Sequence, residues 1–248
     1  MNKEQRDAYV IFAKQQLGIE FKNIDLLITA LTHRSYVNEH RDKTIEHNER
    51  LEFLGDAVLE LVSSDFLYRN YHQPEGIMTS WRAALVNTDA NAAAGEELGY
   101  GPLVRLSNGE KRGSSRAHRV IMADCYEAVI GAIYLDQGYA VAEQFILKHT
   151  ISKIDEILET ESWRDSKSYL QELAQRLDNA TPTYTVLREE GPDHDKTFTV
   201  GVLVNGHIKA TGSGHSKQDA QVKAASEAIR QYKRASQQPS KDLRKTQK

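Results

Sequence analysis

The residues best suited to catalysis in this sequence are two groups of carboxylates at helical spacing. Glu49, Glu52 and Asp56 follow one another at intervals of three and four residues, so a helix would place them on one stripe. Asp124 and Glu127 stand one helical turn apart in a later segment. Carboxylate oxygens are the ligands that Mg²⁺ prefers, together with water and substrate phosphate. The spacing is therefore compatible with a divalent-metal site.

The surroundings of the second group favour this interpretation, although simpler ones stay open. Residues 120–135 are otherwise largely apolar, and an unpaired charge buried among them would be costly. A bound cation would offset that cost. Alternatively, the second group pairs with Arg50 or Arg116. The first group could equally belong to an ordinary solvated helix face.

The elements that must position these carboxylates are helices. Apolar residues recur every three or four positions in four stretches of the first 160 residues: 9–12, 51–61, 83–98 and 121–135. Four apolar positions are expected on the side of the helix opposite the first carboxylate group: Leu51, Leu54, Val58 and Leu61. Breakers rich in Gly, Pro and Asn separate the stretches. The first 160 residues are therefore predicted to be all-α.

The chain changes character after about residue 160. A short helix at 167–177 is followed by three strand-like runs: 183–187, 197–204 and 207–211. Asn205-Gly206 joins the last two runs and is a strong hairpin signal. A final helix is expected from Lys217 to about Tyr232, with Ser216 and Asp219 placed as a capping box. The order α-β-β-β-α describes a small α+β module.

Composition narrows the class of protein. The 248 residues are 40% hydrophobic and 27% charged, a globular balance compatible with one or two domains. No apolar run approaches the roughly 18–20 residues of a membrane span, and the first residues do not resemble a secretory signal. The single cysteine excludes an internal disulfide framework and a cysteine-based zinc cluster. We expect a cytoplasmic protein that does not bind membranes.

Charge is distributed unevenly along the chain. Residues 1–160 hold 17 basic and 24 acidic side chains, whereas residues 161–248 hold 15 and 11. Most of the excess positive charge follows residue 228, where seven basic residues face only Asp242. An acidic front and a basic back indicate two modules with different roles, although two ordinary solvated surfaces would show the same balance.

Residues 48–58, NERLEFLGDAV, closely resemble the signature segment of the ribonuclease III family. The resemblance extends to LTHRSY at 31–36, to Glu75-Gly76, to Arg82-Ala83 and to ADCYEA at 123–128, and covers essentially residues 5–158. The α-β-β-β-α module resembles the double-stranded-RNA-binding domain of bacterial members. The resemblance implies a multidomain chain divided as follows: an all-α ribonuclease III endonuclease domain at 1–160, a linker at 161–165, a double-stranded-RNA-binding domain at 166–235 and a basic, disordered tail at 236–248.

The same resemblance implies a Mg²⁺-dependent endoribonuclease that cleaves double-stranded RNA, with Mn²⁺ as a substitute ion. The implied metal ligands are Glu52, Asp56, Asp124 and Glu127, of which Asp56 and Glu127 are also the implied catalytic pair. Glu49 and Glu75 match auxiliary acidic positions. The implied enzyme is a homodimer in which each subunit cuts one strand, leaving 5′-phosphate and 3′-hydroxyl ends with short 3′ overhangs. Its implied substrates are ribosomal RNA precursors and structured transcripts.

The resemblance also assigns the RNA contacts of the second module. The matching positions are Gln171 and Glu172 on the first helix, His194 between two strands, and Ser216 and Lys217 at the start of the last helix. Such modules read duplex shape through 2′-hydroxyls and phosphates. Here Gln218 and Gln221 follow Lys217 where the family usually carries several lysines, so we expect weaker phosphate attraction, which the basic tail could compensate.

Two other functions remain compatible with the sequence. A non-catalytic binder of double-stranded RNA could keep the nuclease domain only for dimerisation, but such a protein would be free to lose the acidic residues. A phosphohydrolase of small nucleotides would not need a duplex-binding module. Cys125 is interpreted as a buried core residue rather than as a nucleophile.

Overall fold

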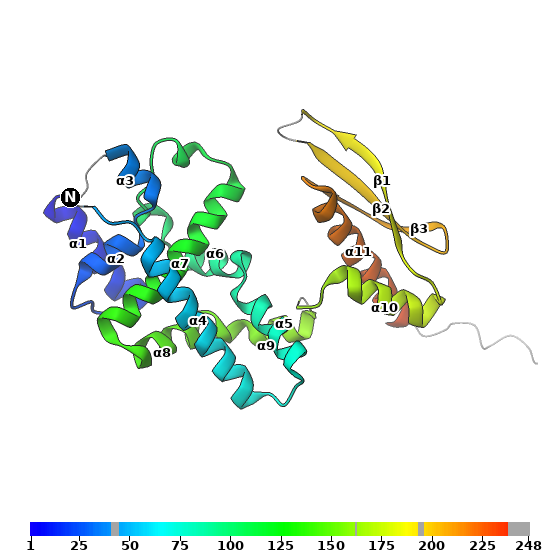
Figure 1. Cartoon of the computed structure of the whole chain (residues 1–248), viewed down its shortest axis with the longest axis horizontal. Coiled ribbons are helices and arrows are strands. Elements are labelled where there is room, and N and C mark those ends of the chain that lie inside the picture. Colours follow the sequence, from blue (N-terminus) through cyan, green and yellow to red (C-terminus); the bar gives the residue numbers. More distant parts are fainter. Residues whose placement is uncertain (41–44, 162, 193–195, 238–248) are drawn as a thin grey trace, which may run out of the picture. The chain divides into compact units, whose positions relative to one another are not determined.

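The computed structural model describes residues 1–40, 45–161, 163–192 and 196–237 (Figure 1). The chain forms two compact units that divide between Trp163 and Arg164, within the expected linker. Trp163 packs edge-on against Trp81, with ring centroids 6.0 Å apart, so this part of the linker segment belongs to the first unit. None of the helices in the described ranges combines the length and apolar character of a membrane span.

The first unit is helical, as predicted. Its α-helices are α1 (Lys3–Phe12), α2 (Ile24–Ala30), α3 (Arg34–His40), α4 (Glu49–Asn70), α5 (Glu75–Val86), α6 (Thr88–Glu97), α7 (Ser115–Gln137), α8 (Tyr139–His149) and α9 (Ile154–Thr160). Shorter helical segments are η1 (Ala13–Leu17), η2 (Gly101–Leu103), η3 (Glu110–Arg112) and η4 (Ile151–Lys153). Most residues of α7 from Ile121 to Ile133 are buried, which makes α7 the centre of the core.

The apolar stretch at 83–98 is divided between two helices rather than one. Asn87 has extended backbone dihedrals, and its side chain accepts a hydrogen bond from the Ala90 amide. An asparagine that caps a helix in this way ends the preceding helix and starts the next. The chain therefore turns at Asn87, and α6 lies against α7.

The apolar side of α4 also differs from the prediction. Leu51 and Val58 are buried and Leu54 is half-buried, but Leu61 is 57% exposed. Leu61 therefore shares the apolar spacing of the other three positions without being part of the buried face. The buried face is centred on Gly55 and Leu59, because α7 packs along this side of α4.

The second unit has the predicted α-β-β-β-α order. It consists of α10 (Ser166–Asp178), β1 (Thr183–Glu190), β2 (Thr197–Val204), β3 (His207–Gly214) and α11 (Lys217–Gln237). The strands form an antiparallel sheet in the order β1-β2-β3, and the two helices pack together against one face of it (Figure 1). Asn205 and Gly206 have positive φ angles of 52° and 77°, as the predicted tight hairpin requires.

Candidate active site

Two glycines let α4 and α7 meet backbone to backbone. A Cβ added to Gly55 would lie 1.7 Å from the carbonyl oxygen of Glu127, and one added to Gly131 would lie 2.2 Å from that of Leu51. No larger residue fits at either position without separating the helices. Because the crossing is this close, the carboxylates of the two helices lie within one turn of it.

The four predicted metal ligands are brought together at this crossing. Glu52 and Asp56 come from α4, and Asp124 and Glu127 come from α7. Asp56 is exposed, whereas the other three are half-buried. Residues separated by about 70 positions in the chain therefore share one acidic site.

Burial and the charges of neighbouring carboxylates raise the pKa values of three of these residues. The pKa of Glu52 rises to about 7, first because of burial and then because of the negative charges of Asp124, Glu49 and Asp56. The pKa of Glu127 also rises to about 7, through burial and the charge of Asp56, while a hydrogen bond from Asn91 opposes the rise. Burial raises the pKa of Asp124, and the negative charge of Glu49 adds to the rise. A bound cation would relieve this repulsion.

The donor set fits a hard divalent ion. All four side chains offer oxygen, and half-buried carboxylates that repel one another are the environment in which Mg²⁺ gains most from binding. Across the described ranges, no three histidine, cysteine, aspartate or glutamate side chains are arranged so that they could hold a metal ion as they stand. The carboxylates would have to draw closer together to bind one.

Asn91 of α6 is a member of the site that the sequence did not reveal. Its Nδ2 donates a hydrogen bond of 2.7 Å to Oε1 of Glu127. Only 1% of its surface is exposed. The one available signal was a polar residue inside the apolar stretch 83–98, and nothing in the spacing linked it to Glu127.

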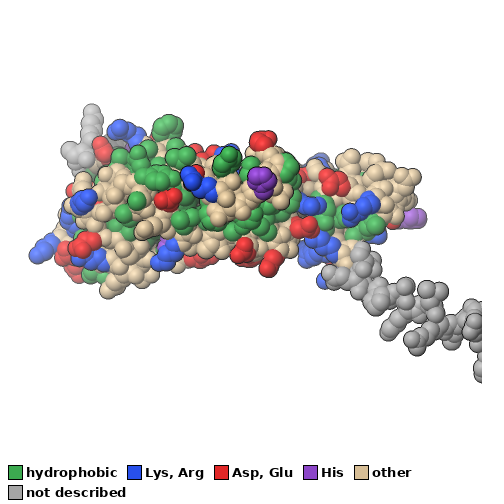
Figure 2. All heavy atoms as spheres, turned by 90° about the horizontal axis from the view of Figure 1, so that it is seen from below, with side chains coloured by type: hydrophobic (Ala, Val, Ile, Leu, Met, Phe, Trp, Pro, Cys, Tyr) green, Lys and Arg blue, Asp and Glu red, His purple; other side chains and the backbone are tan. Residues whose placement is uncertain are grey.

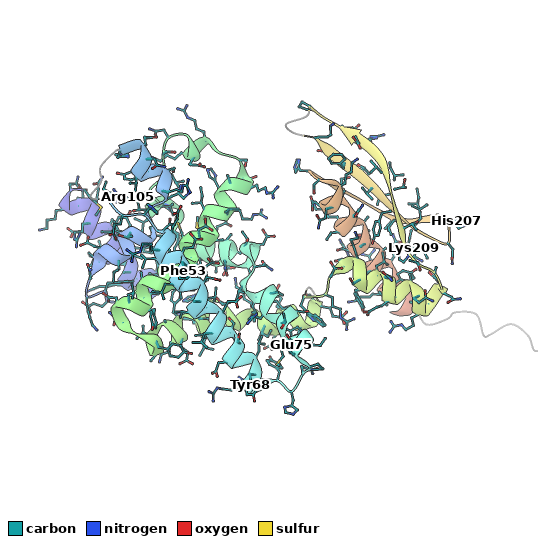
Figure 3. All side chains as sticks on the ribbon, in the orientation of Figure 1. Phe53, Tyr68, Glu75, Arg105, His207 and Lys209 are labelled. Atoms are coloured by element: carbon teal, nitrogen blue, oxygen red, sulfur yellow. The ribbon has the colours of Figure 1, made fainter. Side chains whose placement is uncertain are left out.

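The two auxiliary acidic residues lie in different places. Glu49 begins α4 at the rim of the site, where Arg34 Nη1 donates a 3.1 Å hydrogen bond to it. Glu75 is the first residue of α5, beyond the Tyr68 end of α4 (Figure 3). Its recorded side-chain partner is Thr79, 3.1 Å away. The structure of one chain therefore gathers Glu49 with the four carboxylates and leaves Glu75 apart.

The alternative pairing of the second carboxylate group is not observed. Among the described residues, neither Asp124 nor Glu127 forms an ion pair with Arg50 or Arg116. Cys125 is completely buried, and burial raises the pKa of its thiol to about 12. It is a core residue, as predicted, and remains a neutral thiol.

The predicted RNA contacts of the second unit lie on the surface where they are described. Gln171 and Glu172 are exposed on α10, and Ser216 and Lys217 are exposed at the start of α11. Ser216 Oγ accepts a 3.1 Å hydrogen bond from the Asp219 amide, which is one half of the predicted capping box. His194 and residues 238–248 of the basic tail lie outside the described residues.

Lys217 has an acidic partner in this chain. Its Nζ lies 3.1 Å from Oε1 of Glu189 on β1, and it also lies over the ring of Phe198. A phosphate group would have to compete with that carboxylate. This ion pair agrees with the weaker phosphate attraction that the sequence leads us to expect.

Comparison with known proteins identifies both units. Residues 23–154 match the family model described as ribonuclease-III-like, and residues 166–232 match the double-stranded RNA binding motif. A protein named Ribonuclease 3 from Desulforamulus reducens is 44% identical over 230 residues, covering 92% of this chain and 93% of its own. The chain belongs to the ribonuclease III family.

Other members of the ribonuclease III family support the assignment. Ribonuclease 3 of Geobacillus kaustophilus is 44% identical over 95% of this chain and 96% of its own length. A solved ribonuclease III nuclease domain from Campylobacter jejuni, described for flexibility in a region involved in dimer formation, is 38% identical with a TM-score of 0.52. It covers 58% of this chain and 96% of its own. The chain is therefore an endoribonuclease of double-stranded RNA, with a ribonuclease III domain followed by a double-stranded-RNA-binding domain.

Proposed function

We propose that this ribonuclease III cleaves double-stranded RNA with Mg²⁺ held by Glu52, Asp56, Asp124 and Glu127, and that Mn²⁺ can replace Mg²⁺. The observation that carries the proposal is the close crossing of α4 and α7 at Gly55 and Gly131, where burial and neighbouring carboxylates raise the pKa values of Glu52 and Glu127. Like charges gathered this closely are unfavourable unless a cation joins them.

Each residue of the site has a distinct part in the proposed reaction. The four carboxylates would hold Mg²⁺, which would lower the pKa of an attacking water and stabilise the charge of an in-line phosphodiester displacement. Asp56 is the most exposed of the four, and Glu127 is half-buried and held by Asn91. Glu49 and Glu75 assist as auxiliary acidic residues.

The proposed chemistry needs no covalent enzyme intermediate. Cys125, the one cysteine, is buried and held as a neutral thiol, so it offers no nucleophile. Direct attack by water leaves a 5′-phosphate and a 3′-hydroxyl. Ribosomal RNA precursors and structured transcripts are the proposed substrates, because the second unit binds duplexes by shape.

We further propose that the enzyme acts as a homodimer through the outer face of α4. Three large hydrophobic residues are exposed on it: Phe53 at 80%, Leu61 at 57% and Tyr68 at 76%. Phe53 and Tyr68 are labelled in Figure 3. A hollow of about 570 Å³ lies at the Phe53 end of α4, lined in part by Leu26, Ile45, Leu51, Leu54 and Leu135. A projecting aromatic residue next to an apolar hollow suits a two-fold interface, in which each copy offers both features.

Exposed hydrophobic side chains are also seen on the surface of the first unit. Figure 2 shows one face of this unit, on which hydrophobic side chains lie among acidic and basic ones. Contiguous exposed apolar surface on a globular protein marks an interaction site. The Campylobacter jejuni relative, described for a region involved in dimer formation, supports the same assembly.

A labelled hairpin RNA containing a long duplex tests the proposed metal chemistry. We expect cleavage with Mg²⁺, none with EDTA, and a loss of at least 10³-fold in kcat for Glu127→Gln, a magnitude typical of removing a group that stabilises transition-state charge. Duplex binding in EDTA should stay within about twofold, because the RNA-binding unit is untouched. Glu156→Gln, which removes an exposed carboxylate on α9, is the matched control.

The same experiment separates the alternatives. A non-catalytic binder would retain the RNA without cutting it at any Mg²⁺ concentration. Retained cleavage by Glu127→Gln, with ends carrying 5′-phosphate, would refute the role given to this residue.

A further inference from the structure

Asn91 of α6 is held in one orientation by two acceptors. Its Nδ2 donates to Oε1 of Glu127 at 2.7 Å and to the backbone oxygen of Val86 at 3.2 Å. Val86 is the last residue of α5, so its carbonyl lacks a partner within that helix. Rotating the amide by 180° would place Oδ1 against both acceptors. The two contacts therefore fix Nδ2 toward the carboxylate.

A short side chain reaches Glu127 because α6 lies very close to α7. The inner face of α6 consists of small buried residues, Ala92, Ala94 and Gly95, together with Asn91. A Cβ added to Gly95 would lie 3.0 Å from the sulfur of Met122 on α7. A larger residue along this face would move α6 outward and take the amide out of range.

The hydrogen bond to Val86 accounts for only part of the reason for an amide at this position. Oδ1 of Asn91 is buried and accepts no hydrogen bond from the described part of the chain. An unsatisfied buried acceptor is destabilising, so the amide must contribute through its donor group. The shorter of its two donor contacts, at 2.7 Å, is the one to Glu127.

We propose that Asn91 is a positioning residue for the divalent-metal site, an inference that rests on the function proposed above. By holding Oε1 of Glu127 it fixes the rotation of that carboxylate, which would keep its other oxygen available to a metal. Without the N–H group, Glu127 turns away from the charge of Asp56, and the ligand set has to be reassembled at each binding event. Partners of metal ligands typically contribute 10–100-fold in metal affinity.

Titration calorimetry with Mn²⁺ alone, on the full-length protein without RNA, tests this role. Asn91→Leu removes the donor while keeping the branching and heavy-atom number of the side chain, and we expect the Kd for Mn²⁺ to rise roughly 10–100-fold. Asn91→Ala serves as the second variant, since its neighbours on α6 are already small. Thr150→Val is the control, because it removes a buried 2.7 Å hydrogen bond to Tyr126 away from the carboxylates.

Cleavage kinetics provide a second readout. At low Mg²⁺, kcat of Asn91→Leu should fall while KM for the duplex is unchanged, and excess Mg²⁺ should restore kcat. Wild-type Mn²⁺ affinity in both Asn91 variants, or the same loss in Thr150→Val, would overturn the positioning role. Failure of both Asn91 variants to fold would also overturn it, because the residue would then be structural. A wild-type protein that binds Mn²⁺ but does not cut RNA would instead overturn the proposed function. The calorimetric comparison of wild type with the Asn91 variants would still test the positioning role.

Discussion

At the scale of single residues, the candidate site is defined by carboxylates that burial and neighbouring negative charge make easier to protonate. Glu52 and Glu127 have pKa values of about 7, mainly because of burial, and their neighbours add to the effect. Asn91 partly opposes this rise at Glu127 by donating to the ionised form. Protons would compete with the proposed metal for the oxygens of Glu52 and Glu127. Metal affinity is therefore expected to increase as the pH rises and these carboxylates ionise.

These two glutamates should make the metal-free enzyme less stable as the pH rises. An unfolded glutamate ionises near pH 4.5, whereas Glu52 and Glu127 do so near pH 7 in the folded chain. Between these values the folded state binds more protons, so increasing pH lowers the free energy of unfolding. In EDTA, raising the pH from 5 to 8 should lower the thermal midpoint of the wild type more than that of Glu127→Gln. At pH 8 the variant should unfold roughly 2–4 °C higher, the shift that about 1 kcal/mol produces.

Addition of Mg²⁺ at pH 8 provides the control for this prediction. It should raise the midpoint of wild type more than that of Glu127→Gln, because the variant has lost one ligand. If the thermal midpoints of the two proteins changed by the same amount from pH 5 to 8, the assigned pKa of Glu127 would be contradicted.

At the scale of elements, α4 and α7 determine the geometry of the site. Their backbones touch at Gly55 and Gly131, so the spacing of the carboxylates is set by the helices rather than by side-chain conformation. The small face of α6 completes the arrangement by bringing Asn91 to Glu127. A site carried by packed helices is more rigid than one carried by loops.

Gly55→Ala should therefore damage both the fold and the site. The new methyl group would meet the rigid carbonyl of Glu127, and we expect a loss of about 3 kcal/mol, or roughly 6–12 °C in the thermal midpoint of the nuclease unit. Mn²⁺ affinity, measured by calorimetry below the transition, should fall as well. In Gly76→Ala the added Cβ meets nothing within 4 Å, so its midpoint should change by no more than about 2 °C. Equal effects of the two substitutions would contradict the close helix crossing.

At the scale of the whole molecule, the proposed dimer would bring two sites to one duplex, and the exposed face of α4 is the surface proposed to pair the two copies. Phe53 is the most exposed large hydrophobic residue in the described ranges. Fully burying one phenylalanine contributes roughly 1.5–3 kcal/mol, and a two-fold interface buries it twice. The second unit, which matches the double-stranded RNA binding motif, is expected to add affinity for the duplex.

Phe53→Glu should convert the dimer into monomers. Loss of two buried rings corresponds to roughly 10²–10⁴-fold in the dissociation constant, and the introduced carboxylates would oppose association further. Sedimentation velocity across a concentration series measures the change. Leu177→Glu, at a 50% exposed leucine of the second unit, is the matched control. A dimer that survives Phe53→Glu at low micromolar concentration would place the interface elsewhere.

The sequence by itself determined that the first unit is helical, that the second has the order α-β-β-β-α, and which carboxylates are candidate metal ligands. Helical spacing identified α4 and α7 with their carboxylates, and Asn205-Gly206 located the hairpin, because these signals are local along the chain. The double-stranded-RNA-binding module was recognisable for the same reason.

Only the tertiary structure decided which of these residues meet. The contact of Gly55 with the backbone of Glu127, the reach of Asn91 and the exposure of Leu61 all depend on a partner helix distant in sequence. Periodicity indicates that one face of a helix such as α4 is apolar. It does not indicate whether another helix or solvent covers each residue of that face. Burial and proximity belong to pairs of elements, and a single sequence carries no direct record of those pairs.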